Sequence, residues 1–168
     1  MFGQPLGVQV VEEGGAHDAA LAEGLDARRT VAVDPLGLPR HITLMTTPIT
    51  LPAIRDAARA ALGNAGLPLT AIHDSPGFVA QRVLAMIVNI GCDIAQQRIA
   101  TPDDIDGAVT LGLGYPQGPL AFGDALGPRT VLDILDTLHA FYRDPRYRPS
   151  PWLIRRARLG VSLLTPEN

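Results

Sequence analysis

Residues 74–100, DSPGFVAQRVLAMIVNIGCDIAQQRIA, decide the fold of this chain. Ser75 stands where a residue would cap the first turn of a helix, and Pro76 suits the first helical position. The run 79–100 contains no proline and a single glycine, and its large apolar residues recur at helical spacing. The stretch therefore predicts a helix of about 30 Å, at 1.5 Å per residue, that is buried on most sides.

A narrower polar stripe accompanies the apolar residues of this predicted helix. It consists of Gln81, Arg82, Asn89, Asp93 and Gln96. We expect the stripe to be the side that is left for solvent, a cleft or a partner. A helix as apolar as this one needs other helices around it, and the sequence downstream supplies them.

The chain changes character at about residue 74. Residues 1–73 alternate between short Val- and Thr-rich runs, typical of strands, and helical patterns, which predicts a parallel α/β sheet. The expected strands are 6–11, 30–33, 41–45 and 69–72, and the expected helices are 16–23 and 52–65. Residues 74–168 contain no convincing strand, and Thr101 with Pro102 repeats the cap pattern of a helix start. We therefore place a domain boundary between residues 73 and 74.

Composition excludes several classes of function. The net charge of −3 gives no electrostatic reason to expect nucleic acid as a partner. No apolar run reaches 18 residues and the N-terminus lacks a signal-peptide pattern, so we expect a cytoplasmic protein without a membrane span. All fourteen basic residues are arginine, which removes catalysis by a lysine from consideration.

Cysteine and histidine indicate no metal site. Cys92 is the only cysteine, so it forms no disulfide within the chain, and we interpret it as a small buried hydrophobic residue and not as a reactive thiol. The four histidines lie far apart in sequence, without the spacing of metal ligands. A pair of His73 with Asp74 is one option, but a hydrogen-bonded structural histidine is the interpretation that we favour.

Two further patterns have competing interpretations. The run 112–118, GLGYPQG, could be taken for a dinucleotide fingerprint, but that fingerprint follows a strand and opens a helix, whereas a helical pattern precedes this one. We interpret it as a turn. The arginines at 143, 146, 148, 155, 156 and 158 could bind a phosphate, such as that of a CoA nucleotide. We favour a solvated face whose arginine stems cover Tyr147 and Trp152.

Three motifs occur together in one order: DSPGFVAQRVL at 74–84, RIATPDDIDGAVTLGLGYPQGPLAFGDALG at 98–127 and DPRYRPSPWL at 144–153. Over about residues 74–155 the chain resembles the C-terminal helical domain of bacterial 3-hydroxyacyl-CoA dehydrogenases. The resemblance implies an all-α domain of the 6-phosphogluconate dehydrogenase C-terminal type in residues 74–168. It also implies that residues 1–73 are a truncated Rossmann-like α/β remnant with parallel strands.

The resemblance implies the oxidation of 3-hydroxyacyl-CoA to 3-oxoacyl-CoA with NAD, in fatty-acid β-oxidation or related acyl-CoA catabolism. In that family a histidine, oriented by a glutamate, abstracts the proton. Leu44 stands at the place of this histidine, and a leucine cannot accept a proton. The segment that would carry the glutamate is missing. We therefore expect this chain to bind no cofactor alone, with NAD bound by the complete enzyme.

The resemblance also implies site residues and partners. Gln81 takes the place of the family's active-site asparagine and is the candidate catalytic residue, and Tyr115 and Gln117 are the candidate substrate-binding residues, near the acyl chain of an acyl-CoA. The helical domain is expected to form a homodimer or to pair with a complete dehydrogenase half, as in a tandem enzyme. The alternative is a non-catalytic dimerisation module, and a third option is a related dehydrogenase acting on small hydroxy acids.

Overall fold

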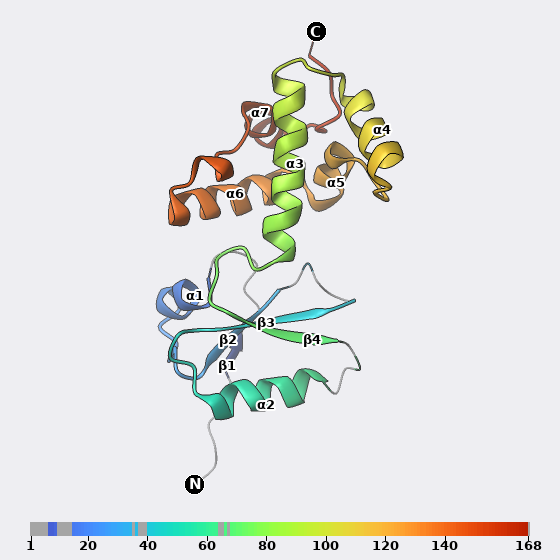
Figure 1. Ribbon diagram of the computed structural model, residues 1–168. Helices are drawn as coiled ribbons and strands as arrows, with labels where there is room; N and C mark the ends of the chain where they lie inside the picture. Colours follow the sequence, from blue (N-terminus) through green and yellow to red (C-terminus); the bar gives the residue numbers. More distant parts are fainter. Residues whose placement is uncertain are drawn as a thin grey trace. The chain divides into compact units, whose positions relative to one another are not determined.

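A computed structural model describes residues 7–9, 15–34, 36, 40–63, 66 and 68–167. Contacts divide the chain into two units, residues 1–81 and residues 82–168. In Figure 1 all strands belong to the first unit, and the second unit is helical over its described length. The contacts group residues 74–81 with the sheet, whereas the boundary expected from sequence lies before residue 74; that boundary stays a prediction.

The first unit is a four-stranded sheet with two helices. Its elements are β1 (Gly7–Gln9), α1 (Ala16–Ala22), β2 (Thr30–Val33), β3 (Ile42–Thr46), α2 (Pro52–Gly63) and β4 (Leu69–His73). The strands lie in the order β1-β2-β3-β4. Each element expected from sequence is present within the described residues, and the parts of two expected elements at residues 6, 10, 11, 64 and 65 lie outside them.

The prediction of a parallel sheet is wrong at its centre. β1 pairs with β2 and β3 pairs with β4 in parallel, but β2 and β3 are antiparallel, with Val33 opposite Leu44. Only residues 34–41 separate β2 from β3. Parallel neighbours need a crossover of about a dozen or more residues, so this short connection reverses the chain direction.

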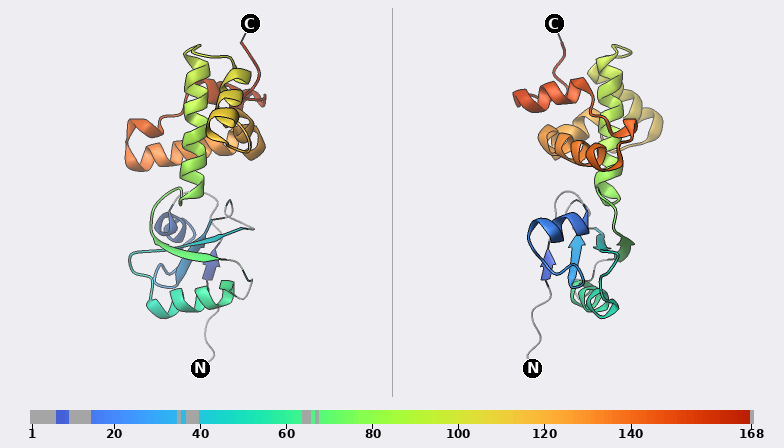
Figure 2. Two further views of the ribbon diagram at one scale, coloured as in Figure 1. Left: turned by 45° about the vertical axis from the view of Figure 1, so that its right-hand side comes forward. Right: turned by 90° about the vertical axis from the view of Figure 1, so that its left-hand side faces the viewer.

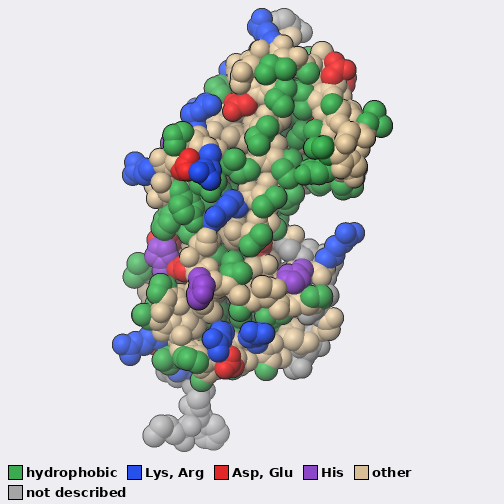
Figure 3. All heavy atoms as spheres, in the orientation of Figure 1, with side chains coloured by type: hydrophobic (Ala, Val, Ile, Leu, Met, Phe, Trp, Pro, Cys, Tyr) green, Lys and Arg blue, Asp and Glu red, His purple; other side chains and the backbone are tan. Residues whose placement is uncertain are grey.

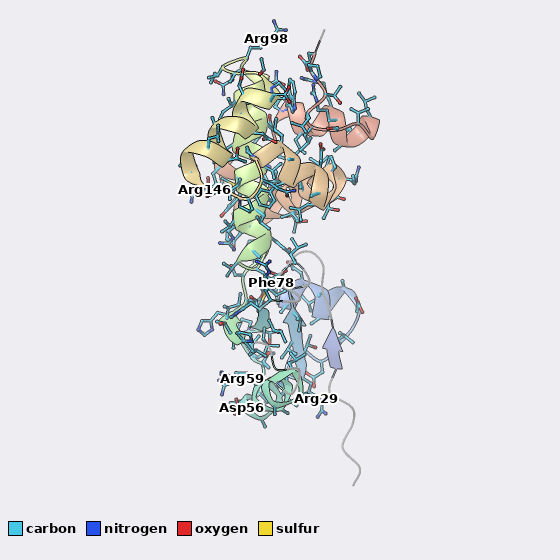
Figure 4. All side chains as sticks on the ribbon, turned by 90° about the vertical axis from the view of Figure 1, so that its right-hand side faces the viewer. Arg29, Asp56, Arg59, Phe78, Arg98 and Arg146 are labelled. Carbon is cyan, nitrogen blue, oxygen red and sulfur yellow. The ribbon has the colours of Figure 1, made fainter. Side chains whose placement is uncertain are left out.

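Alternation along the strands builds a core on each face of the sheet. Val31, Val33, Ile42 and Leu44 point to one face, where they pack with Ala58 of α2. Ile54 and Leu62 join this cluster, because residues four apart share one side of a helix. Ala32 and Met45 point to the other face, with Ala16 of α1 and Phe78. Figure 2 shows α1 and α2 on opposite sides of the sheet, and Figure 4 shows Asp56 and Arg59 on the outer side of α2.

A distant carboxylate caps α1. Gly15 precedes the helix and has no side chain with which to cap it. Asp74, which follows β4, instead accepts the N–H groups of Ala16 and His17 at 2.9 and 3.0 Å. A Cβ atom at Gly15 would lie 2.8 Å from the Asp74 carboxylate. Asp74 therefore ties the end of β4 to the start of α1, and glycine at position 15 makes room for the contact.

The long helix begins later than the sequence pattern predicts. Residues 76–79 form a turn, and α3 spans Ala80–Gln96. Gly77 and Phe78 have φ angles of +81° and +44°, which no residue of a right-handed helix adopts. The predicted cap at Ser75 and helix start at Pro76 are therefore wrong. The turn instead buries Phe78 beneath α1.

The second unit contains the rest of α3 and five further helices. These are α4 (Pro102–Leu113), α5 (Pro119–Leu126), α6 (Pro128–Tyr142), a short 3-10 helix η2 (Pro145–Tyr147) and α7 (Pro151–Leu159). The predicted cap of α4 is confirmed, because the Thr101 hydroxyl accepts the N–H of Asp104 at 3.2 Å. The α3 and α5 backbones approach closely: a Cβ at Gly91 of α3 would lie 2.8 Å from Pro119 of α5, and one at Gly123 of α5 would lie 2.7 Å from Val88 of α3.

Two residues of the expected polar stripe of α3 lie on its buried side. Gln81 and Asn89 are almost fully buried, whereas Arg82, Asp93 and Gln96 are partly exposed, as expected. Val83 and Ile90 are instead 51% and 55% exposed. The buried side of α3 is made largely of small residues, such as Ala85 and Cys92, which allow neighbouring helices to approach. The large aliphatic side chains are consequently left on the outer side.

Membrane insertion finds no support in the described part of the chain. None of the helices there combines the length and the apolar character that a membrane span requires.

Candidate functional site

The turn between α4 and α5 carries two of the residues assigned from sequence, Tyr115 and Gln117. Gly114 ends α4 with a φ angle of +68°, a conformation that glycine adopts without strain. Pro119 opens α5. Tyr115 and Gln117 lie between these points, and both side chains are exposed. They are therefore accessible to a ligand, within a turn whose two ends are fixed by the adjoining helices.

Asp106 of α4 holds this turn in place. Its carboxylate oxygens accept the N–H groups of Leu120 and Ala121, each at 2.8 Å, at the start of α5. A Cβ atom at Gly118 would overlap Asp106. A carboxylate at a helix N-terminus accepts hydrogen bonds from the free N–H groups and interacts favourably with the helix dipole. Because Asp106 belongs to α4 and the N–H groups belong to α5, this contact fixes the angle between the two helices.

The same contact shows that the turn does not fit a dinucleotide. A dinucleotide fingerprint places a pyrophosphate at the N-terminus of the helix that follows its glycines. Here the Asp106 carboxylate already occupies the N-terminus of α5, and the preceding element is the helix α4. A pyrophosphate at this place would meet a negative charge and a filled position.

Replacing Asp106 with alanine is expected to lower the free energy of unfolding of the helical unit by about 2 kcal/mol, because two helix N–H groups lose their acceptor. Urea denaturation followed by circular dichroism measures the change. Asp136→Ala, an exposed carboxylate within α6, is the control and should change the value by less than about 0.5 kcal/mol. Equal effects of the two substitutions would contradict the assigned role of Asp106.

Gln81, the candidate catalytic residue, lies in the first unit, near the start of α3. Its side chain is only 1% exposed. Its amide nitrogen Nε2 donates to Oδ1 of Asp34, which follows β2, at 3.1 Å. Burial raises the pKa of Asp34, while hydrogen bonds from the Leu36 backbone and from Gln81 lower it. The structure thus places Gln81 in a buried polar pair, whereas Tyr115 and Gln117 belong to the second unit.

Leu44 occupies the place that the resemblance gives to the catalytic histidine. The side chain is fully buried within β3 and belongs to the apolar cluster beneath α2. Its cross-strand neighbours are Val33 and Ala71. This environment lacks solvent and charge, and the leucine serves packing there.

Cys92 of α3 is fully buried, and burial raises the pKa of its thiol to about 12. The thiolate is the reactive form, and burial disfavours it here. We expect no reaction with Ellman's reagent in the folded chain and one equivalent of reaction after denaturation with guanidinium. Rapid reaction in native buffer would contradict this burial.

The arginine cluster is engaged mainly with its own chain. The Arg156 guanidinium lies 3.2 Å from the centroid of the Trp152 ring and donates to the Thr165 carbonyl. Arg155 pairs with Glu167 at 2.6 Å, which lowers the pKa of that carboxyl. Arg156 thus covers Trp152 as expected, but it does so with its guanidinium and is buried, so it does not belong to a solvated face. In Figure 4, Arg146 is seen at the helical unit.

The outer face of α3 carries exposed aliphatic side chains in a row along the helix. We define this outer face by Val83, Ile87, Ile90 and Ile94, of which Ile87 and Ile94 are partly exposed. The residues are separated by four, three and four positions, the spacing of the contact seam in a pair of helices. Figure 3 shows hydrophobic side chains gathered along the line on which α3 runs in Figure 1.

Two polar contacts escaped the sequence interpretation. Asp34 directly follows β2, and its partner Gln81 lies 47 positions away in the sequence. Asp74 contacts His17, with Nδ1 of His17 2.6 Å from Oδ2 of Asp74, whereas the sequence offered the adjacent His73 as one option and did not favour it. Neither contact can be predicted from a local sequence pattern, because each joins two segments that are distant in the sequence. Among the described residues no cluster of three metal-ligating side chains is present.

Comparison with known proteins identifies the helical region. The family model described as "3-hydroxyacyl-CoA dehydrogenase, C-terminal domain" matches residues 77–162. The 3-hydroxyadipyl-CoA dehydrogenase of Escherichia coli K12 is 36% identical over 152 residues, which cover 90% of this chain and 32% of that protein. The chain spans about a third of the length of the first curated relatives that it matches.

Solved structures give the same result. The crystal structure of 3-hydroxybutyryl-CoA dehydrogenase from Escherichia coli K12 is 32% identical with a TM-score of 0.80, and the match covers 90% of this chain and 32% of that chain. A (S)-3-hydroxybutyryl-CoA dehydrogenase from Ralstonia eutropha has a TM-score of 0.84 at 23% identity, covering 96% of this chain and 60% of that one. At this lower identity the second likeness shows a shared fold alone.

Proposed function

Because this chain belongs to the 3-hydroxyacyl-CoA dehydrogenase family, we propose that it forms the C-terminal portion of an NAD-dependent enzyme that oxidises 3-hydroxyacyl-CoA to 3-oxoacyl-CoA. In this proposal the helical domain contributes to the acyl-CoA cleft and supplies a pairing surface. The exposed turn with Tyr115 and Gln117 is the proposed contact for the acyl chain. The sheet unit is proposed to be a shortened remnant of a dinucleotide-binding domain.

Proton abstraction is assigned to another dehydrogenase half. The support is Leu44, which is packed in the core of the sheet unit and to which the resemblance gives the place of the catalytic histidine. A general base must be able to accept a proton and must lie within hydrogen-bonding reach of its substrate, and a buried leucine meets neither condition. NAD would accordingly be held by the complete half and not by this chain.

The outer face of α3 is the proposed surface for pairing with a second helical domain. Val83 and Ile90 are each more than half exposed, and aliphatic side chains in a continuous row at this spacing favour contact with a second helix. We commit to a second helical domain of this fold as the occupant. A second copy of this chain is the simplest test case, because such a row can face its own symmetry mate.

Calorimetric titration tests the proposal. The purified chain, alone and mixed with a complete 3-hydroxyacyl-CoA dehydrogenase half, is titrated with acetoacetyl-CoA and with NADH, and hydride transfer is assayed in parallel. We expect no turnover by the chain alone, and a gain in acyl-CoA binding or in dehydrogenase activity on mixing. Turnover by the chain alone would overturn the assignment of Leu44.

The second candidate function is a non-catalytic dimerisation module with no substrate of its own. It is favoured by the same two observations, the buried Leu44 and the exposed outer face of α3. The titration separates the candidates: self-association without any gain in acyl-CoA binding or activity on mixing would leave the dimerisation module as the function.

A further inference from the structure

A buried polar pair joins the end of β2 to the first turn of α3. Asp34 is 0% exposed and Gln81 is 1% exposed. Oδ1 of Asp34 accepts two hydrogen bonds, from the Leu36 backbone N–H at 3.0 Å and from Nε2 of Gln81 at 3.1 Å. Both donors therefore converge on the same oxygen of the carboxyl group.

The other two side-chain oxygens of the pair lack hydrogen-bond partners. Oδ2 of Asp34 and Oε1 of Gln81 are buried, and neither has a hydrogen-bond partner among the residues that the structure describes. Buried polar atoms are nearly always satisfied, since burial removes the water that would otherwise bond to them. A carboxylate and an amide oxygen are both acceptors, so they cannot satisfy each other while Asp34 is ionised.

We propose that Asp34 keeps its proton in the folded chain well above the pH at which an exposed aspartate is ionised, and that its Oδ2–H donates to Oε1 of Gln81. Protonation makes Oδ2 of Asp34 a hydrogen-bond donor, and Oε1 of Gln81 is the acceptor that it can bond to. The result is a neutral carboxylic acid–amide pair with a hydrogen bond in each direction. The inference does not rest on the proposed function.

The surroundings of Asp34 favour the neutral form. Its backbone N–H donates to the Thr43 carbonyl of β3 at 3.0 Å, and Gln81 is its contact on α3. Burial is the largest influence on the pKa of Asp34 and raises it. Of the described groups that shift this pKa, the other two are the uncharged Leu36 backbone and Gln81, so no charge among them compensates an ionised carboxylate.

The pair makes Asp34 a positioning residue for Gln81. With Nε2 donating to Oδ1 and Oε1 accepting from Oδ2, the amide of Gln81 is fixed in one orientation. Nε2 carries two N–H groups and the pair uses one of them, so one N–H of Gln81 remains as a donor. Gln81, at the place where the resemblance puts an active-site asparagine, is held by Asp34 in one orientation while the pair is intact.

Carbon-13 NMR of the intact chain, labelled at the aspartate carboxyl carbons, tests the protonation directly. Asp34 is expected to titrate at a clearly higher pH than an unperturbed aspartate, near 3.9. Comparison with Asp34→Asn assigns its signal. Titration of Asp34 at or below that value would overturn the proposal.

Urea denaturation of the wild type and of Asp34→Asn at several pH values is the second test. A pKa raised in the folded state gives stability that is full below the unfolded value, near 3.9, and is lost as pH rises through the folded value. In that window the unfolding equilibrium constant of the wild type should rise by up to tenfold per pH unit relative to Asp34→Asn, whose amide donates at every pH. Parallel pH profiles would contradict the neutral pair, and the control Asp136→Asn, at an exposed position within α6, should follow the wild type.

Discussion

Ile90→Asp is expected to weaken pairing of this chain by at least about 100-fold, a loss of about 2.7 kcal/mol in the free energy of association. Ile90 stands in the middle of the outer face of α3, between Ile87 and Ile94. A carboxylate there would be carried into an apolar contact without a partner charge, which costs free energy that the isolated chain does not lose. Sedimentation velocity across a range of concentrations measures the change.

The matched control for this substitution is Leu159→Asp. Leu159 is 73% exposed and lies on α7, outside the outer face of α3, so the substitution introduces the same charge on an exposed aliphatic position. We expect it to leave association unchanged. Both variants should retain the unfolding free energy of the wild type within about 0.5 kcal/mol, because neither side chain belongs to the core. Equal weakening by both variants would argue against a specific contact through α3.

Asn89→Ala is expected to lower the free energy of unfolding of the helical unit by about 2–4 kcal/mol. The Asn89 side chain donates to the Arg148 carbonyl at 3.0 Å and accepts the N–H of Ser150 at 2.8 Å. Ser150 is fully buried, so its N–H would be left without an acceptor, and such a loss costs about 1–3 kcal/mol for each group. Thermal or urea denaturation provides the measurement.

Gln97→Ala is the control for Asn89, since Gln97 follows α3 and is exposed. Its replacement should change the unfolding free energy by less than about 0.5 kcal/mol. If Asn89→Ala changed the unfolding free energy as little as this control does, the 148–150 segment would not depend on the Asn89 side chain.

The elements were predictable because their signals are local. Thr101 and Pro102 mark the start of α4 in sequence and form its cap in the structure. Short apolar runs bounded by Pro and Gly likewise identify β2 and β3. Capping and strand alternation depend on neighbours a few residues away, and the sequence displays those neighbours directly.

The direction of the strands and the faces of α3 were not predictable in the same way. The antiparallel pairing of β2 with β3 follows from a short connection, which an alternating pattern of strands and helices conceals. The inward side of α3 follows from long-range contacts. Asn89 turns inward to bind the 148–150 segment, and Gln81 turns inward to bind Asp34, so hydrophobicity alone wrongly assigned these two residues to the solvent side.

The residues of the candidate site also differ in whether a local sequence pattern reveals them. The exposed turn with Tyr115 and Gln117 was identified from its motif, and their roles stay predictions. Asp106, which fixes that turn, and Asp34, which holds Gln81, both act on partners distant in sequence. A carboxylate that caps a remote helix or pairs with a remote amide leaves no periodicity in its own neighbourhood.

A cysteine scan of the outer face of α3 tests the central claim most directly. Val83, Ile87, Ile90 and Ile94 are each replaced by cysteine, with Leu159→Cys as the control, and the chains are oxidised under mild conditions. The buried Cys92, whose thiol pKa is raised to about 12, should not take part. The account predicts disulfide-linked dimers from positions on the outer face and none from the control. Monomers at every position, or equal linkage from Leu159→Cys, would contradict it.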